Sequence, residues 1–270
     1  MKKIILVALI IASLSLAFAA KKSNQLTCSG STTVLPIAQA AAEAYMAKNP
    51  EINISVRGGG SGVGAAALIA GSVDIANTSR AFKSKEITQA KSKGVNPVAY
   101  FIANDGIAIV VNKANPVKAL TLKQLQQIYT GKISNWNQLG GNNQPIVVIS
   151  RDVASGTYEV FNDKALKGAK VVDSAQMLAS NNAVATTVGD TPGAIGYIGL
   201  GYMNDKVHAL SIDNVLPTEQ TVKNQSYKLS RKLYMYTNGK ARGNAAQFIA
   251  FLQSPEGQAL VVKAGFLSLN

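Results

Sequence analysis

Three short stretches of the chain combine hydroxyl side chains with glycine, a combination suited to holding an anion. They are Gly30-Ser31-Thr32-Thr33, Gly60-Ser61-Gly62 and Ser155-Gly156-Thr157, and Arg151 stands shortly before the last of them. Backbone N–H groups in the first turn of a helix lack intrahelical partners, and the helix dipole favours negative charge there. Glycine lets a ligand approach the backbone, and arginine adds a forked permanent charge. The stretches therefore predict an oxyanion site, although Ser155 or Thr157 alone could be a plain helix cap.

Each stretch lies between a predicted strand and a predicted helix. In the first part of the chain, strands are expected over 25–28, 52–56 and 73–77, and helices over 34–48, 63–70 and 83–93. The apolar residues of these segments follow the spacing of strands and helices respectively. A strand–helix alternation of this kind implies an α/β fold with a parallel sheet and right-handed crossovers. Such sheets bind ligands at the carboxyl ends of their strands, where the three stretches lie.

The rest of the chain predicts a second group of strands and helices, followed by a return to the first group. Two apolar runs, 98–102 and 106–111, flank Ala103-Asn104-Asp105, where we expect the chain to leave a first lobe. A strand over 145–149 leads into the Arg151 stretch, and a helix is expected from about Tyr158. The remaining expected elements are helices over 120–129 and 181–188, a strand over 193–198, a return near 199–204, a strand over 227–236, and helices over 244–253 and 255–264.

The first nineteen residues have the pattern of a cleavable signal peptide. Lys2 and Lys3 precede an apolar run that ends in Ala17-Phe18-Ala19, which fits a small-x-small cleavage site. The alternative is an uncleaved N-terminal anchor, but the run is short for a membrane-spanning helix. We therefore expect an exported, periplasmic protein that is cleaved after Ala19.

Composition excludes several classes of function. The chain has 27 Lys and Arg against 14 Asp and Glu, yet its basic residues are scattered, with only short pairs such as Arg231-Lys232. Few aromatic residues are interleaved with them, so we expect a solvated surface and no nucleic-acid platform. Cys28 and His208 are the only residues of their types, which excludes an internal disulfide and argues against a histidine-based metal site or a Ser–His pair. We expect no metal and no cofactor.

The motifs together resemble the phosphate-binding proteins of bacterial phosphate ABC transporters. The segments that carry the resemblance are Gly30-Ser31-Thr32-Thr33-Val34-Leu35-Pro36, Gly60-Ser61-Gly62, Asp74-Ile75-Ala76-Asn77-Thr78-Ser79-Arg80, Ser150-Arg151-Asp152, Ser155-Gly156-Thr157 and Gly193-Ala194-Ile195-Gly196-Tyr197. They occur in the family's order and span nearly the whole chain after the leader. The resemblance implies a two-lobed fold of the type II periplasmic binding proteins, in which each lobe is a mainly parallel sheet flanked by helices and a two-strand hinge joins the lobes. The expected division is a signal peptide over 1–19, a first lobe over 20–103, a second lobe over 104–203, and a return to the first lobe over 204–270.

The resemblance also implies which residues contact the anion. The family's contacts correspond here to Thr32, Thr33, Ser61, Arg151, Ser155, Gly156 and Thr157. In the third loop the family often has an aspartate that accepts the proton of hydrogen phosphate, whereas this chain has Ser79 followed by Arg80. Asp152 could take over that role or only orient Arg151. Arg80 could add charge to the site or form a structural ion pair with Asp74 or Asp152.

The expected function is therefore capture of inorganic phosphate and its delivery to an ABC import permease by a monomeric protein that is not an enzyme. Because the third loop lacks the aspartate, sulfate, molybdate or tungstate is an alternative ligand. An exported phosphate-ester hydrolase with Ser61 or Ser155 as nucleophile is a further alternative, and the lack of an evident base beside either serine counts against it.

Overall fold

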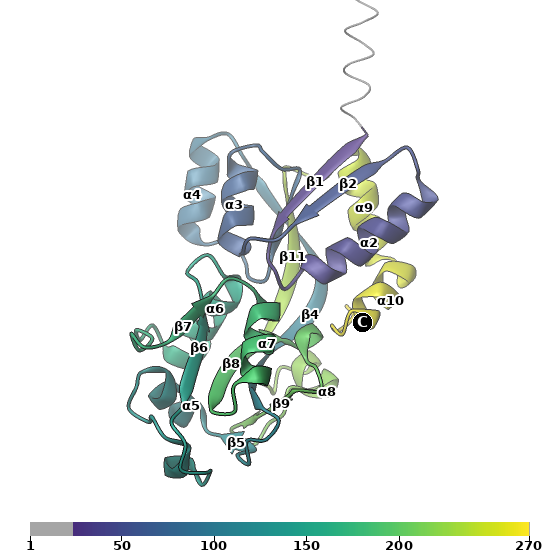
Figure 1. Cartoon of the computed structure of the whole chain (residues 1–270). Coiled ribbons are helices and arrows are strands. Elements are labelled where there is room, and N and C mark those ends of the chain that lie inside the picture. The colour runs from purple at the N-terminus through teal and green to yellow at the C-terminus, as the bar shows by residue number, and fades with distance from the viewer. Residues whose placement is uncertain (1–23, 270) are drawn as a thin grey trace, which may run out of the picture.

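The computed structural model describes residues 24–269, and the predicted signal peptide lies outside this range. Within it, the strands form one nine-stranded sheet in the order β2-β1-β3-β11-β4-β8-β6-β7, with β9 paired to β4 (Figure 1). A separate parallel pair joins β5 (Ala119–Leu120) to β10 (Ser211–Ile212). The strands of the main sheet are β1 (Gln25–Gly30), β2 (Asn53–Arg57), β3 (Ile75–Thr78), β4 (Pro97–Asn112), β6 (Val147–Arg151), β7 (Gln176–Leu178), β8 (Ala194–Gly199), β9 (Val207–Ala209) and β11 (Ser230–Asn238).

Apart from α8, which was not predicted, the described helices lie close to their predicted positions. They are α2 (Leu35–Lys48), α3 (Ser61–Ile69), α4 (Ser84–Ser92), α5 (Leu122–Tyr129), α6 (Gly156–Phe161), α7 (Asn181–Asp190), α8 (Glu219–Lys223), α9 (Gly243–Gln253) and α10 (Pro255–Lys263). The predicted starts of α3 and α6, at 63 and 158, are two residues too late. Ser61 and Gly156 therefore lie in the first turn of their helices, where backbone N–H groups have no intrahelical acceptor. None of the described helices is both long enough and apolar enough to cross a membrane.

The sheet is mixed, whereas mainly parallel pairing was expected. β1 pairs in parallel with β2 and β3, and β6 pairs in parallel with β7 and β8. The long strands β4 and β11 pair antiparallel with each other and with their other neighbours, β3, β8 and β9. These two strands run between an upper and a lower group of elements in Figure 1.

The two expected runs over 98–102 and 106–111 are in fact the single strand β4. The polar residues between them suggested a break, but Asp105 is fully buried and pairs across the sheet with Arg231 of β11. An ion pair between neighbouring strands allows two charges to remain inside a sheet that is otherwise apolar.

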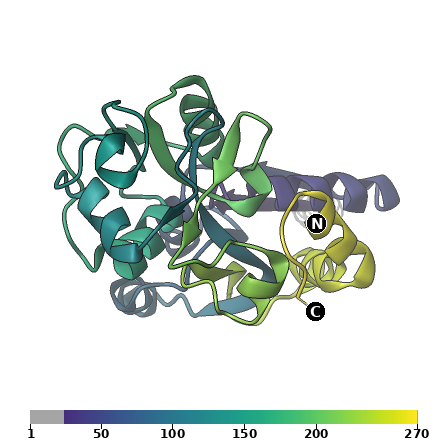
Figure 2. The ribbon, with the colours of Figure 1, turned by 90° about the horizontal axis from the view of Figure 1, so that it is seen from below.

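Each group of elements has its own apolar core on both faces of the sheet. In the upper group, α2 and α9 cover one face through Ile37 and Phe248, and α3 covers the other through Leu68. Figures 1 and 2 both show α9 and α10 beside α2. Cys28 of β1 is buried in this core, as predicted, and burial raises the pKa of its thiol to about 12.

In the lower group, alternate residues of β4 face opposite cores. Ile107 and Ile109 pack in the core that contains Trp136, whereas Ala108 and Val110 pack against α7. Residues 207–229 also belong to this group, because Leu210, Ile212, Val222, Tyr227 and Leu229 lie in the Trp136 core. The chain thus re-enters the upper group through β11.

Candidate functional site

The three hydroxyl-rich stretches lie together where the upper and lower groups of elements meet. Thr33 Oγ1 in the loop before α2 lies 3.1 Å from Thr157 Oγ1 in α6. The backbone N–H of Gly62 in α3 donates to the carbonyl oxygen of Ala154 at 3.0 Å. The starts of α2, α3 and α6 therefore converge on one region, as the sequence predicted from their position after strands β1, β2 and β6.

The predicted site residues are almost all buried. Thr32, Thr33, Ser61, Ser79, Arg80, Arg151, Ser155, Gly156 and Thr157 are buried, and Asp152 is half-buried. Ser155 caps α6, because its Oγ accepts a hydrogen bond from the Tyr158 N–H at 3.2 Å. Ser61 Oγ accepts a hydrogen bond from the Ser79 N–H at 3.0 Å. Ser79 thus fixes the position of the Ser61 hydroxyl.

Arg151 is the most deeply enclosed cation of this region, with a relative exposure of 1%. Its Nε donates to the carbonyl oxygen of Leu178 at 2.9 Å, and its Nη2 donates to Thr32 Oγ1 at 3.1 Å. Its Nη1 is buried and has no hydrogen-bond partner among the described residues. Burial lowers the pKa of Arg151 from its ordinary value, but a guanidinium stays protonated in proteins. A buried cationic donor of this kind is suited to an anion ligand.

Two of the predicted residues, Asp152 and Arg80, have polar partners outside the cluster of threonine hydroxyls. Asp152 Oδ1 accepts a hydrogen bond from the Ala154 N–H at 3.0 Å, which stabilises the turn before α6. Arg80 pairs with Glu86 of α4 at 2.7 Å and with Glu159 of α6, and its expected partners Asp74 and Asp152 are not involved. Asp74 instead accepts a hydrogen bond from the Thr27 N–H at 2.7 Å. Arg80 therefore forms a structural ion-pair cluster that connects the upper and lower groups of elements.

We expect Glu86→Gln to weaken this cluster and to lower the free energy of unfolding by about 1–3 kcal/mol at pH 7. Burial alone would raise the pKa of Glu86, but the Arg80 ion pair and the Lys83 N–H lower it below its ordinary value. A carboxyl group whose pKa is lower in the folded state stabilises the fold above its unfolded pKa, about 4.3, and that contribution is lost as the pH falls through the folded pKa.

Urea unfolding of wild type and Glu86→Gln should therefore give a gap that is full at pH 7 and closes below about pH 4. Glu51→Gln, at an exposed position, is the matched control and should leave stability unchanged. A gap that stays constant with pH would show that the Glu86 charge does not stabilise the fold.

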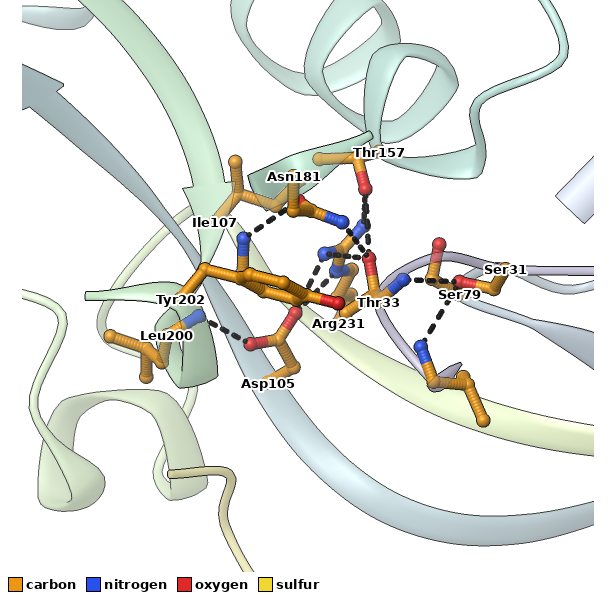
Figure 3. A network of polar contacts seen from close by, with 12 residues as sticks. Ser31, Thr33, Ser79, Asp105, Ile107, Thr157, Asn181, Leu200, Tyr202 and Arg231 are labelled. Carbon is orange, nitrogen blue, oxygen red and sulfur yellow. Dashed lines mark hydrogen bonds and ion pairs between the residues drawn. The ribbon is translucent and has the colours of Figure 1, made fainter. Parts of the chain in front are cut away.

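Three residues of the site were not anticipated from the sequence: Asn181, Arg231 and Asp105 (Figure 3). Asn181, the first residue of α7, donates through Nδ2 to Thr32 Oγ1 at 3.1 Å and to Thr33 Oγ1 at 3.0 Å. Arg231 donates through Nη1 to Thr157 Oγ1 at 2.9 Å and through Nη2 to Thr33 Oγ1 at 3.2 Å. The three threonine hydroxyls are thus held by side chains from α7 and β11 as well as by Arg151.

Arg231 is itself held by Asp105. Its Nε and its Nη2 each lie 2.7 Å from Asp105 Oδ2, and the two side chains are 3% and 0% exposed. Complete burial raises the pKa of the Asp105 carboxyl, while the Arg231 charge and the Leu200 N–H, 3.0 Å from Oδ1, oppose that rise. The expectation of a solvated Arg231-Lys232 pair was therefore wrong for Arg231, which is a second buried cation beside the converging loops.

Tyr202 adds a contact between the lower group and the first loop. Its hydroxyl donates to the backbone carbonyl oxygen of Thr32. Burial raises the pKa of Tyr202 to about 12, so the phenol remains a neutral donor at physiological pH. Together with Arg151 and Asn181, Tyr202 holds the Thr32 loop against the lower group.

Asn181 has a sequence signal that resembles those of the predicted loops. Ser180 caps α7, accepting a hydrogen bond from the Ala183 N–H at 3.0 Å, and α7 follows β7. A hydroxyl side chain at a helix start after a strand is one part of the pattern by which the other loops were recognised. Asp105 and Arg231 have no such signal, because each lies within a strand and becomes a site residue only through the pairing of β4 with β11.

Among the described residues, neither Ser61 nor Ser155 has a base hydrogen-bonded to its hydroxyl. Ser61 Oγ is bonded to the Ser79 N–H and lies 3.3 Å from Ser79 Oγ, and Ser155 Oγ is bonded to the Tyr158 N–H. His208 Nε2 lies 3.0 Å from the carbonyl oxygen of Val117. The described residues therefore give the hydrolase alternative neither an imidazole nor a carboxylate hydrogen-bonded to Ser61 or Ser155.

Gly156 is required by the close approach of α6 to Ser61. A Cβ atom at Gly156 would lie 2.2 Å from Ser61 Oγ and 2.8 Å from Ser79 Oγ. We therefore expect Gly156→Ala to force the loop between β6 and α6 away from α3 and to reduce anion affinity by about tenfold or more. Gly62→Ala is the matched control, because its Cβ would meet Ala154 O at an ordinary 3.4 Å.

Titration of both glycine variants with phosphate by calorimetry, together with circular dichroism to check the fold, distinguishes them. Wild-type affinity in Gly156→Ala would show that the contact between α6 and Ser61 is not needed for binding.

Comparison with known proteins places this arrangement in a family. The PBP superfamily domain matches residues 18–256. The phosphate-binding protein PstS of Bacillus subtilis is 38% identical over 252 residues, which cover 93% of this chain and 82% of that protein. A putative phosphate ABC transporter substrate-binding protein from Clostridium perfringens, solved with bound phosphate, is 37% identical with a TM-score of 0.84 over 92% of this chain and all of that one.

An ABC-type phosphate transport receptor from Vibrio cholerae is 35% identical with a TM-score of 0.74, over 90% of this chain and 99% of the receptor. The match to the family model, the sequence identity and the structural similarity all extend over most of this chain. The chain therefore belongs to the PBP superfamily and, within it, to the family of phosphate-binding proteins PstS.

Proposed function

We propose that the protein binds inorganic phosphate and delivers it to an ABC import permease. The observation that carries the proposal is the buried Arg151, whose Nη1 has no hydrogen-bond partner among the described residues and which lies among threonine hydroxyls at the starts of helices. The similar proteins from Clostridium perfringens and Vibrio cholerae support it through their bound phosphate and their role in phosphate transport, respectively. Binding involves no chemical reaction, in keeping with the family.

The proposed ligand contacts are the Arg151 guanidinium, the hydroxyls of Thr32, Ser61, Ser155 and Thr157, and the backbone at Gly156, while the Thr33 hydroxyl lies 3.1 Å from Thr157 Oγ1 and supports it. Hydrogen bonds from these groups replace the water shell of the anion, and charge-assisted bonds from Arg151 are the strongest of them. The Ser79 N–H donates a hydrogen bond to Ser61 Oγ and so holds that hydroxyl in place. We assign Arg80 and Asp152 to structural roles, because their hydrogen bonds go to Glu86, Glu159 and the Ala154 N–H.

The upper and lower groups of elements form two lobes in this proposal, with β4 and β11 as the hinge. Separate apolar cores in the two groups support the division. The cores also favour a second lobe that extends from 104 to 229, in place of the sequence-based limit of 203. The first lobe then comprises residues 20–103 and the return over 230–270. Closing the lobes around phosphate is the family's hinge type of motion.

The predicted signal peptide over 1–19 and membership in a family of transport receptors support export to the periplasm. The permease is the partner implied by the Vibrio cholerae receptor's name. We propose that the protein acts as a monomer.

The test is a calorimetric titration of purified protein with phosphate and with sulfate. Phosphate should bind and, at a hundredfold excess over its dissociation constant, should stabilise the fold by about 2.7 kcal/mol. Sulfate is the relevant competitor, because Ser79 replaces a carboxylate acceptor that would reject a fully deprotonated anion. Tight sulfate binding without a phosphate signal would overturn the phosphate assignment.

A further inference from the structure

The hydroxyls of Thr32 and Thr33 already accept as many hydrogen bonds as they can. A hydroxyl has one hydrogen to donate and two lone pairs that accept. Thr32 Oγ1 accepts from Arg151 Nη2 and from Asn181 Nδ2, each at 3.1 Å. Thr33 Oγ1 accepts from Asn181 Nδ2 at 3.0 Å and from Arg231 Nη2 at 3.2 Å. Both hydroxyls are therefore restricted to donating their hydrogen.

The orientation of the Asn181 amide is fixed independently. Its Oδ1 accepts a hydrogen bond from the Gly199 N–H on β8 at 3.1 Å. A backbone N–H only donates, so the oxygen of the amide must face Gly199 and the nitrogen must face the threonines. The two arginines have no acceptor at all. Arg151, Asn181 and Arg231 are thus all donors to the hydroxyls of Thr32 and Thr33.

The Thr157 hydroxyl is likewise limited to donating its hydrogen. Thr33 Oγ1 lies 3.1 Å from Thr157 Oγ1 and, with both lone pairs occupied, must be the donor of that bond. Thr157 Oγ1 also accepts from Arg231 Nη1 at 2.9 Å, so its own lone pairs are occupied too. The hydrogens of Thr32 and Thr157 are then left to point toward a further acceptor, which in the proposed function is the anion.

We propose that Asn181, assisted by Arg231, is a positioning residue for the threonine wall, which consists of the hydroxyls of Thr32, Thr33 and Thr157. The hydrogen bonds from Asn181 and Arg231 leave the wall able only to donate hydrogen bonds, so that it selects unprotonated phosphate oxygens. The inference rests on the proposed function and deepens it, because it names the form of phosphate that binds. A protonated oxygen is a weaker acceptor, and its own hydrogen finds no acceptor on the wall. The dianion HPO4²⁻, with three unprotonated oxygens, fits better than the monoanion H2PO4⁻, with two.

The test compares Asn181→Asp, Asn181→Ala and the control Asn182→Asp in the intact protein. Asn181→Asp keeps the shape but replaces the donor by an acceptor, so that the Thr32 and Thr33 hydroxyls turn toward residue 181. Phosphate affinity should then fall by about 100-fold or more, and by about tenfold in Asn181→Ala. Asn182→Asp places the same charge on the neighbouring exposed residue of α7 and should stay within about threefold of wild type.

The pH profile separates positioning from a merely structural role. Wild-type affinity should fall as the pH drops below the second pKa of phosphate, whereas Asn181→Ala should show a flatter profile, because its freed hydroxyls can accept a P–OH hydrogen. Thermal unfolding without phosphate checks that the variants fold.

Wild-type affinity in Asn181→Asp, or parallel pH profiles for wild type and Asn181→Ala, would overturn this inference alone. A wild-type protein that binds no phosphate would instead overturn the proposed function.

Discussion

Replacement of Arg151 by alanine is expected to abolish phosphate binding at micromolar concentrations while the chain still folds. The guanidinium is buried, and its Nη1 has no partner among the described residues. Removing one member of a buried charge pair costs about 2–5 kcal/mol, which is roughly a thirtyfold to several-thousandfold loss of affinity. Calorimetric titration with phosphate measures this loss directly.

The fold should survive because the structural contacts of Arg151 are limited. Its hydrogen bonds to the carbonyl oxygens of Leu178 and Ala179, both at 2.9 Å, would be lost. The cost is on the order of 1–3 kcal/mol, against a total stability of about 5–15 kcal/mol for an ordinary domain. Chemical unfolding of the variant without phosphate should therefore still show a cooperative transition.

Two further variants separate the effect of the Arg151 side-chain shape from the effect of net charge. Arg151→Lys keeps the charge but loses the fork, and it should bind with intermediate affinity. Arg242→Ala removes an exposed arginine at the start of α9 and should bind like wild type, which controls for net charge. Undiminished affinity in Arg151→Ala would show that the loop between β6 and α6 is not the centre of the site.

The parts of the fold that are encoded locally could be predicted from the sequence. The Ser155 cap of α6 acts within a few residues of the chain, and Ser155 was one of the two caps expected from the pattern. The convergence of loops after β1, β2 and β6 follows from the general position of ligand sites in such sheets. These features needed no knowledge of which strands pair.

The parts that depend on pairing between distant segments could not be predicted. Asp105 and Arg231 are 126 residues apart, and only the register of β4 with β11 makes them neighbours. In the sequence, Asp105 looks like a loop residue and Arg231 like a surface charge, because an isolated charge is seldom buried. A structural ion pair was one of the two roles expected for Arg80, but its partner Glu159 could not be predicted, since it lies on a helix of the other group of elements.

The buried pair of Asp105 and Arg231 leads to a second prediction of large effect. Asp105→Asn keeps the shape but leaves the Arg231 charge without its countercharge, and one amide hydrogen now faces a guanidinium that only donates. Breaking a buried ion pair in this way lowers the free energy of unfolding by about 3–5 kcal/mol. Urea unfolding without phosphate should show this loss, and Asp205→Asn, at an exposed position, should not.

Phosphate should restore more stability to Asp105→Asn than it adds to wild type. Arg231 donates to Thr157, a proposed phosphate ligand, and to Thr33 beside it, so a bound anion brings negative charge near the unpaired guanidinium. Unfolding curves at matched phosphate concentrations measure the difference, and equal increments in the two proteins would contradict it. A larger increment means that Asp105 limits the positive charge that the site presents to its ligand. Because the pair bridges β4 and β11, the strands of the proposed hinge then also set the charge of the anion site.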